Sequence, residues 1–64
     1  MAIITVTLIE GRDQDTKTAL MARLTEAVVD VLSAKPGQVR VVLNEVKDGA
    51  YAVAGQPVFL EGHS

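Results

Sequence analysis

The chain has 64 residues, a net charge of −2, a pI near 5.1 and no cysteine. Its six basic residues do not cluster, so the sequence lacks the electrostatic footprint of a nucleic-acid-binding protein. No apolar run approaches the roughly 18 residues of a membrane span and no secretory signal opens the chain, so we expect a cytoplasmic protein without a membrane partner.

Burial of apolar surface is the main difficulty for so short a chain. A domain of this size buries only about 60% of its unfolded surface, yet 48% of the residues are hydrophobic. A disulfide is impossible, and His63 stands in a terminal tail without a second ligand, so no metal or cofactor is expected. We predict one domain over residues 1–64 that shares its apolar surface within a homo-oligomer.

The first two predicted elements are a strand and a helix. Residues 3–9, IITVTLI, are β-branched and apolar and predict a β-strand with two usable faces, one of them formed by Ile4, Val6 and Leu8. Asp13 is a suitable N-cap for an amphipathic helix from about Gln14 to about Ala34. Apolar residues recur in this helix at steps of three and four, at Leu20, Leu24, Ala27, Val28 and Val31, and the predicted core stripe consists of Leu20, Leu24, Val28 and Val31.

A second strand follows directly after the helix. Lys35-Pro36-Gly37 ends the helix, and residues 38–46, QVRVVLNEV, predict a strand whose helix-facing side carries Val39, Val41 and Leu43. A connection of this length predicts a right-handed parallel β-α-β unit of the α/β class. The opposite face of the sheet, with Ile3 and Val42, would have no cover within one chain.

The C-terminal segment predicts a short hairpin or arm. Asp48-Gly49 is a turn signal, and residues 50–60, AYAVAGQPVFL, are small and apolar, with Gly55 and Pro57 interrupting regular pairing. Such a segment could add an edge strand to a neighbouring subunit.

The order and spacing of these motifs resemble subunits of the 4-oxalocrotonate tautomerase family. The resemblance covers nearly the whole chain, from Met1-Ala2-Ile3 and TVTLIEGR through VRVVLNEV to DGAYAVAGQP. It implies a tautomerase-type β-α-β subunit with a C-terminal hairpin or arm, assembled into a homohexamer. It also implies an isomerase that catalyses keto–enol tautomerisation of a small 2-oxo or enol carboxylic acid without a cofactor.

The resemblance further implies four site positions. In the family an N-terminal proline is the general base, and here that position is Ala2; Arg12 and Arg40 match two arginines, and Tyr51 matches an aromatic residue. Two guanidinium groups suit such a substrate, because one can hold a carboxylate bidentately while the other stabilises the enolate charge.

Ala2 leaves two functions open. With Met1 attached the Ala2 nitrogen is an amide without a basic lone pair, whereas without Met1 it is a primary amine. The first function is a weakened tautomerase; the second is a non-catalytic or engineered-inactive oligomer that keeps a carboxylate-binding pocket. Glu10 and Glu45 could supply acid–base chemistry instead, although no spacing argument brings them together.

Each site residue also has a structural interpretation. Arg40 could form a salt bridge on a sheet face, Arg12 could be an ordinary loop cation, and Tyr51 or Phe59 could anchor a subunit interface. No role beyond strand formation is expected for Thr5 and Thr7.

Overall fold

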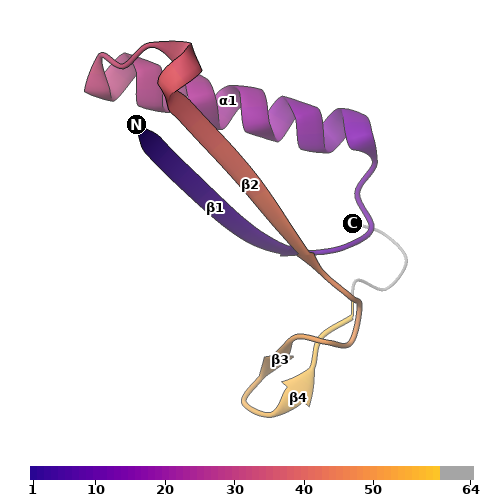
Figure 1. Cartoon of the computed structure of the whole chain (residues 1–64). Helices are drawn as coiled ribbons and strands as arrows, with labels where there is room; N and C mark the ends of the chain where they lie inside the picture. The colour runs from indigo at the N-terminus through magenta and orange to yellow at the C-terminus, as the bar shows by residue number, and fades with distance from the viewer. Residues whose placement is uncertain (60–64) are drawn as a thin grey trace.

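The computed structural model describes residues 1–59 and consists of a β-α-β unit followed by a small hairpin. Strand β1 (Ala2–Ile9), helix α1 (Gln14–Leu32) and strand β2 (Val39–Val46) form the unit, with a single 3-10 turn at Pro36–Gln38. The strands are parallel, with Ala2 opposite Val39 and Ile9 opposite Val46, and α1 lies on one side of them (Figure 1). The predicted parallel α/β unit is therefore confirmed, whereas His63 lies outside the described residues.

The element boundaries follow from local backbone chemistry. Asp13 caps α1 as predicted, because its Oδ1 accepts a hydrogen bond from the backbone N–H of Thr16 at 2.8 Å. The helix ends at Leu32 rather than near Ala34, because Ser33 takes a left-handed conformation with φ 55° that no α-helix continues. The 3-10 turn occupies Gln38, so the second strand begins one residue later than predicted.

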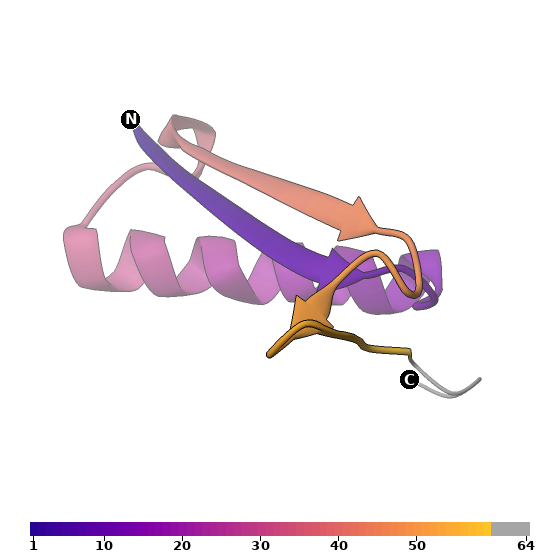
Figure 2. The ribbon, with the colours of Figure 1, turned by 90° about the horizontal axis from the view of Figure 1, so that it is seen from below.

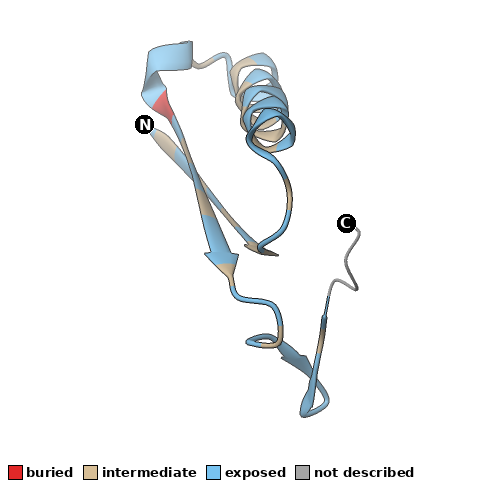
Figure 3. Ribbon diagram, turned by 90° about the vertical axis from the view of Figure 1, so that its right-hand side faces the viewer, coloured by how far each residue is buried: buried red, intermediate tan, exposed pale blue. Residues whose placement is uncertain are grey.

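A thin apolar layer lies between α1 and the sheet. Its strand residues alternate as predicted, and the half-buried ones are Ile4, Val6, Leu8, Val41 and Leu43. Val39, 8% exposed, is the one buried residue among residues 1–59 (Figure 3). At the rim of the layer Lys17 Nζ donates to Glu45 Oε1 at 3.0 Å, which ties the first turn of α1 to the end of β2.

The apolar stripe of α1 is only partly covered by its own sheet. Leu20, Leu24 and Val28 are half-buried as predicted, but Ala27 is exposed and Val31 is 78% exposed. The prediction that Val31 belongs to the core was wrong for the single chain. The helix packs mainly on β2, so its half-buried side also includes Met21, Thr25 and Val29.

The other face of the sheet has no cover within the described chain, as predicted. Ile3 is 65% and Val42 45% exposed there, and α1 lies behind the two strands in Figure 2. The radius of gyration is 14.2 Å, whereas a compact chain of this length would have about 11 Å. The subunit is therefore too open to be stabilised by its own interior alone.

The predicted C-terminal hairpin is present and projects from the end of β2 (Figure 1). Strands β3 (Ala52–Val53) and β4 (Gln56–Pro57) are antiparallel, and the turn between them has positive φ at Ala54 (53°) and Gly55 (81°). Two backbone hydrogen bonds extend the pairing, from Gly49 N to Val58 O and from Val58 N to Tyr51 O. The hairpin arm is thus held together by backbone hydrogen bonds between its own two strands and the residues that flank them.

We expect Gly49→Ala to destabilise the arm. Gly49 has φ +82°, and an added Cβ would lie 2.7 Å from Cε1 of Phe59. The left-handed backbone alone costs an L-residue about 1 to 2 kcal/mol. Urea unfolding at equal protein concentration measures the loss. Gly37→Ala is the matched control, because Gly37 has no positive φ and nothing within 4 Å of a new Cβ; equal stability of the two variants would contradict this account.

Asp13→Asn tests the charge of the helix cap. Hydrogen bonds from the side chain and the backbone of Thr16, aided by Lys17, lower the pKa of the Asp13 carboxyl below its ordinary value of 3.8. A lowered pKa in the folded state means that the charged cap stabilises the protein above pH 3.8 and loses this effect as the pH falls through the folded-state pKa. Urea unfolding of both proteins from about pH 6 down to about pH 3 should show the difference shrinking on acidification. A constant difference would exclude this role.

Candidate functional site

The four predicted site residues lie at two opposite ends of the sheet. Parallel pairing places Ala2 and Arg40 at the amino ends of β1 and β2, where Ile3 is opposite Arg40. Arg12 follows the carboxyl end of β1, and Tyr51 follows the carboxyl end of β2. The structure therefore brings the residues together in two pairs.

Arg12 is held against the end of β1. It is half-buried, and its Nη1 donates to the backbone carbonyl of Ile9 at 2.9 Å. This bond satisfies one N–H of the guanidinium group and leaves others available, since the group carries five. The preceding Gly11, at φ 133°, permits the sharp change of direction after the strand. Arg12 is thus a positioned cation with donors to spare.

A cavity of about 400 Å³ lies next to this arginine. Its lining residues are Thr7, Leu8, Ile9, Arg12, Val46 and Tyr51. The walls are mostly apolar, the guanidinium is the one charged group, and Tyr51, 48% exposed, stands at the rim. A small apolar cavity with one fixed cation and hydroxyl groups from Thr7 and Tyr51 suits a small organic anion.

Sequence reasoning missed part of this lining. The sequence predicts no role for Thr7 beyond strand formation, and the strand-end residues Leu8, Ile9 and Val46 are predicted only as parts of the strands, whereas all four line the cavity. The available signal was the parallel register, because the carboxyl ends of parallel strands meet at one edge of a sheet.

Arg40 is the second cation and lies on the uncovered face of β2. It is exposed, and its Nη1 donates to the carbonyl of Gly37 at 2.7 Å. Ala2 is half-buried at the start of β1 and lies opposite Val39, the residue that precedes Arg40 in β2. This end of the sheet therefore presents a guanidinium beside the amino end of the chain.

The two arginines do not meet within one subunit. Arg40 pairs with Ile3 and Arg12 bonds to Ile9, and at about 3.3 Å per residue these strand positions lie about 20 Å apart. The expectation that Arg12 and Arg40 share one ligand is therefore not met within a single subunit. A shared ligand requires residues from more than one copy.

Carboxylates and metal ligands contribute nothing to the cavity in the described part of the chain. Glu45 is ion-paired with Lys17, and neither Glu45 nor Glu10 lines the cavity. Among residues 1–59 no three His, Cys, Asp or Glu side chains gather closely enough to hold a metal ion. The helix in this part of the chain is also not long and apolar enough to cross a membrane.

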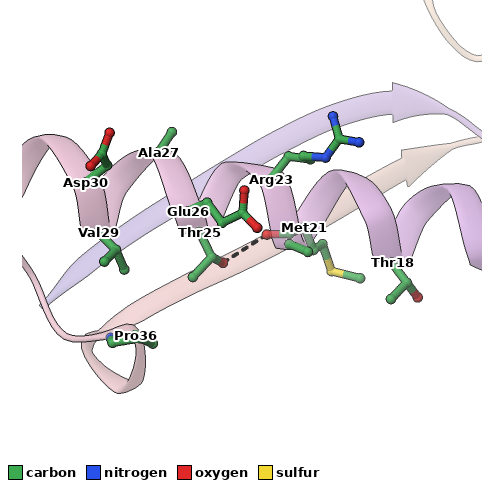
Figure 4. Close-up of a pocket in the computed structure, with 10 residues that line it drawn as sticks. Thr18, Met21, Arg23, Thr25, Glu26, Ala27, Val29, Asp30 and Pro36 are labelled. Carbon is green, nitrogen blue, oxygen red and sulfur yellow. Dashed lines mark hydrogen bonds between the residues drawn. The ribbon is translucent and has the colours of Figure 1, made fainter.

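A larger open groove, about 960 Å³, runs along α1 (Figure 4). Thr25 lies in it, but its hydroxyl donates to the carbonyl of Met21 at 2.8 Å and is satisfied within the helix. Pro36 borders one side. No described residue of the groove is among the four predicted site residues, so the smaller cavity at Arg12 is the candidate site.

Comparison with known proteins identifies the family. The family profile described as tautomerase enzyme matches residues 3–59. A protein named "Probable tautomerase" from Halalkalibacterium halodurans is 43% identical over 58 residues, which cover 91% of this chain and 95% of that protein. The 2-hydroxymuconate tautomerase of Bacillus subtilis is 36% identical over 56 residues, covering 88% of this chain and 90% of the relative.

Solved structures agree with this assignment. The chain is similar to a structure of the 4-oxalocrotonate tautomerase isozymes from Methylibium petroleiphilum, with a TM-score of 0.82, 44% identity and 86% of each chain covered. It is also similar to a heterohexamer 4-oxalocrotonate tautomerase from Chloroflexus aurantiacus, with a TM-score of 0.84, 26% identity, and coverage of 89% of this chain and 92% of that chain. The β-α-β subunit with a hairpin arm therefore belongs to the tautomerase family, among the 4-oxalocrotonate tautomerases.

Proposed function

We propose that this chain is a subunit of a cofactor-independent tautomerase acting on a small 2-oxo or enol carboxylic acid. The observation that carries the proposal is the apolar cavity at the end of β1, in which Arg12 is the one charged group and Tyr51 forms the rim. The printed activity of the Bacillus subtilis relative, 2-hydroxymuconate tautomerase, supports the same substrate class.

The complete site is proposed to form between copies of the chain in a homo-oligomer, a hexamer by resemblance. Arg12 and Tyr51 line the cavity, whereas Ala2 and Arg40 lie about 20 Å away along the sheet. The carboxyl end of one subunit must therefore meet the amino end of another. The uncovered sheet face, with Ile3 and Val42 exposed, supplies the apolar surface for such contacts.

The proposed chemistry divides between the two arginines and an amine. One guanidinium binds the substrate carboxylate, and the other donates hydrogen bonds to the oxygen that becomes negatively charged in the dienolate. A neutral amine at the amino end of β1 would take a proton from one position of the substrate and return it to another carbon. Nearby cations disfavour the protonated amine and so keep it available as a base.

Ala2 does not supply the secondary amine that a proline would provide as the base in this mechanism. With Met1 attached, the Ala2 nitrogen is an amide that accepts no proton, and with Met1 removed it is a primary amine without the restraint of a proline ring. We therefore propose that the chain retains substrate binding and has weak turnover.

A second function is favoured by the same residue. A chain with both arginines but no N-terminal proline could be a non-catalytic oligomer, or it could complete the site of a homologous chain that does supply the amine. The heterohexamer from Chloroflexus aurantiacus supports mixed assembly within this fold. Turnover that appears only after mixing with a proline-bearing homologue would favour this alternative.

Ala2→Pro with Met1 removed should raise tautomerase activity. A terminal proline supplies a secondary amine, and general base catalysis is worth about 100- to 10,000-fold. Ketonisation of 2-hydroxymuconate or phenylenolpyruvate should be compared in both proteins after mass spectrometry of the N-termini. Fast turnover by the alanine protein with Met1 attached would show that another group is the base. An inactive, correctly processed proline variant would favour the non-catalytic function.

Arg40→Ala should weaken binding of a small dicarboxylate by about 2 to 4 kcal/mol, because a bidentate and partly desolvated contact is lost. Arg40→Lys should recover little, since an ammonium group does not reproduce the planar fork. Lys35→Ala is the control, because it removes an exposed cation from the segment that precedes β2. Calorimetry measures all four proteins, and unchanged affinity in Arg40→Ala would assign this arginine a purely structural role.

A further inference from the structure

Two hydroxyl-bearing residues line the cavity next to Arg12, and the mechanism proposed above does not use them. They are Thr7 of β1 and Tyr51, the residue before β3. Both residues are exposed, and neither hydroxyl group has a hydrogen-bond partner within residues 1–59. The two groups are therefore available as donors to a molecule bound in the cavity.

Strand geometry places Thr7 close to the fixed arginine. Side chains alternate along β1, so Thr7 shares the uncovered face of the sheet with Ile9, about 6.6 Å further along the strand. The guanidinium group of Arg12 is held at this end of the strand, because its Nη1 donates to the carbonyl of Ile9 at 2.9 Å. The threonine hydroxyl and the cation thus border the same small space.

The hairpin arm sets the position of Tyr51. The carbonyl of Tyr51 accepts a hydrogen bond from the backbone N–H of Val58 at 2.7 Å, and the N–H of Gly49 donates to the carbonyl of Val58 at 3.1 Å. The arm leaves the sheet at the end where β1 also stops (Figure 1). The backbone of the arm therefore holds the tyrosine beside the ends of the two strands.

A carboxylate bound by Arg12 would have acceptor positions left over. Its two oxygens offer about four lone-pair sites, and a bidentate guanidinium occupies about half of them. The side chains of Leu8, Ile9 and Val46, which complete the cavity wall, contain no hydrogen-bond donor. Thr7 and Tyr51 each carry one O–H donor, so their hydroxyl groups match the acceptor positions that the arginine leaves unfilled.

We propose that Thr7 and Tyr51 are specificity-determining residues whose hydroxyl groups donate hydrogen bonds to the substrate group that Arg12 binds. The site then selects against an oxo or enol acid that presents only hydrocarbon to Arg12, because such a ligand leaves the polar groups of the cavity without an acceptor. This selection rests on the proposed function, since it requires a small oxo or enol acid in the cavity.

Replacements of similar shape test the two hydroxyl groups separately. Tyr51→Phe removes the phenolic oxygen, and Thr7→Val exchanges the hydroxyl group for a methyl group. The probes are 2-oxoadipate and 2-oxohexanoate, which have the same chain length and differ in carrying a carboxylate or a methyl group at the far end. In calorimetry each variant should bind 2-oxoadipate about threefold to tenfold more weakly than the original chain does. The affinity for 2-oxohexanoate should stay nearly unchanged.

Thr5→Val is the matched control for Thr7→Val. Thr5 is also exposed and lies on the same face of β1, two residues earlier, but it does not line the cavity. This variant should bind both acids as the original chain does. An equal loss of affinity for both acids in Tyr51→Phe and Thr7→Val, or the same selective loss in Thr5→Val, would overturn the specificity role.

Two further results separate this role from the proposed function. An original chain that binds both acids, with Tyr51→Phe and Thr7→Val unchanged in affinity, would overturn the specificity role and leave the proposed function standing. An original chain that binds neither acid would overturn both.

Discussion

The subunit cannot bury its own apolar surface, and the rest of the structure depends on this constraint. A single helix on a two-stranded sheet covers one face only, so Val39 is the one buried residue in the described chain while Ile3 and Val42 remain exposed. Burial contributes about 25 cal/mol per Å² of apolar surface, and a chain of this length has little else with which to offset its conformational entropy. In the proposed oligomer, association would supply the burial of apolar surface that a larger protein obtains from its interior. The exposed apolar surface, which would be unfavourable on a monomer, would then form the contacts between copies of the chain.

The parallel register has a direct consequence for where chemistry can occur. Residues that begin the strands, Ala2 and Arg40, gather at one end, and residues that follow the strands, Arg12 and Tyr51, gather at the other. A single chain thus presents a cation at each end of the sheet, one beside the chain start and the other next to the cavity. In the proposed function each end supplies one of the two guanidinium groups of the site, so assembly and activity would be linked by geometry. A change that weakens contacts between copies would then also lower activity without altering the cavity.

Much of the fold could be predicted from local patterns, whereas the coverage of each surface could not. Alternation in the two strands, the Asp13 cap and the turn at Gly49 all depend on interactions between near neighbours, and the structure confirms them. The error at Val31 has a different origin: helical periodicity identifies an apolar stripe but not which molecule covers it. The same limit applies to the site. The family resemblance implied arginines of suitable chemistry, but the separation of Arg12 from Arg40 depends on strand register, and the position of Thr7 in the cavity wall depends on how the strand ends meet.

Alanine at position 2 affects only one of two contributions to catalysis in the proposed mechanism. It affects proton transfer by the terminal amine, and not the hydrogen bonds that the arginines donate to the negatively charged oxygen. Donors aimed at a developing oxyanion are worth about 100- to 1,000-fold each, and they need no proton acceptor to bind an anion that resembles the transition state. In the proposed mechanism, loss of the proline base would slow proton transfer but leave Arg12 in place, because its guanidinium is held by the Ile9 carbonyl rather than by the chain start. A chain with alanine at this position would therefore keep this arginine for binding an enolate-like anion even where it transfers protons slowly. For the proposed site, affinity for an enolate-like anion would then be a better measure than the rate of turnover, since proton transfer is the step assigned to the nitrogen of Ala2.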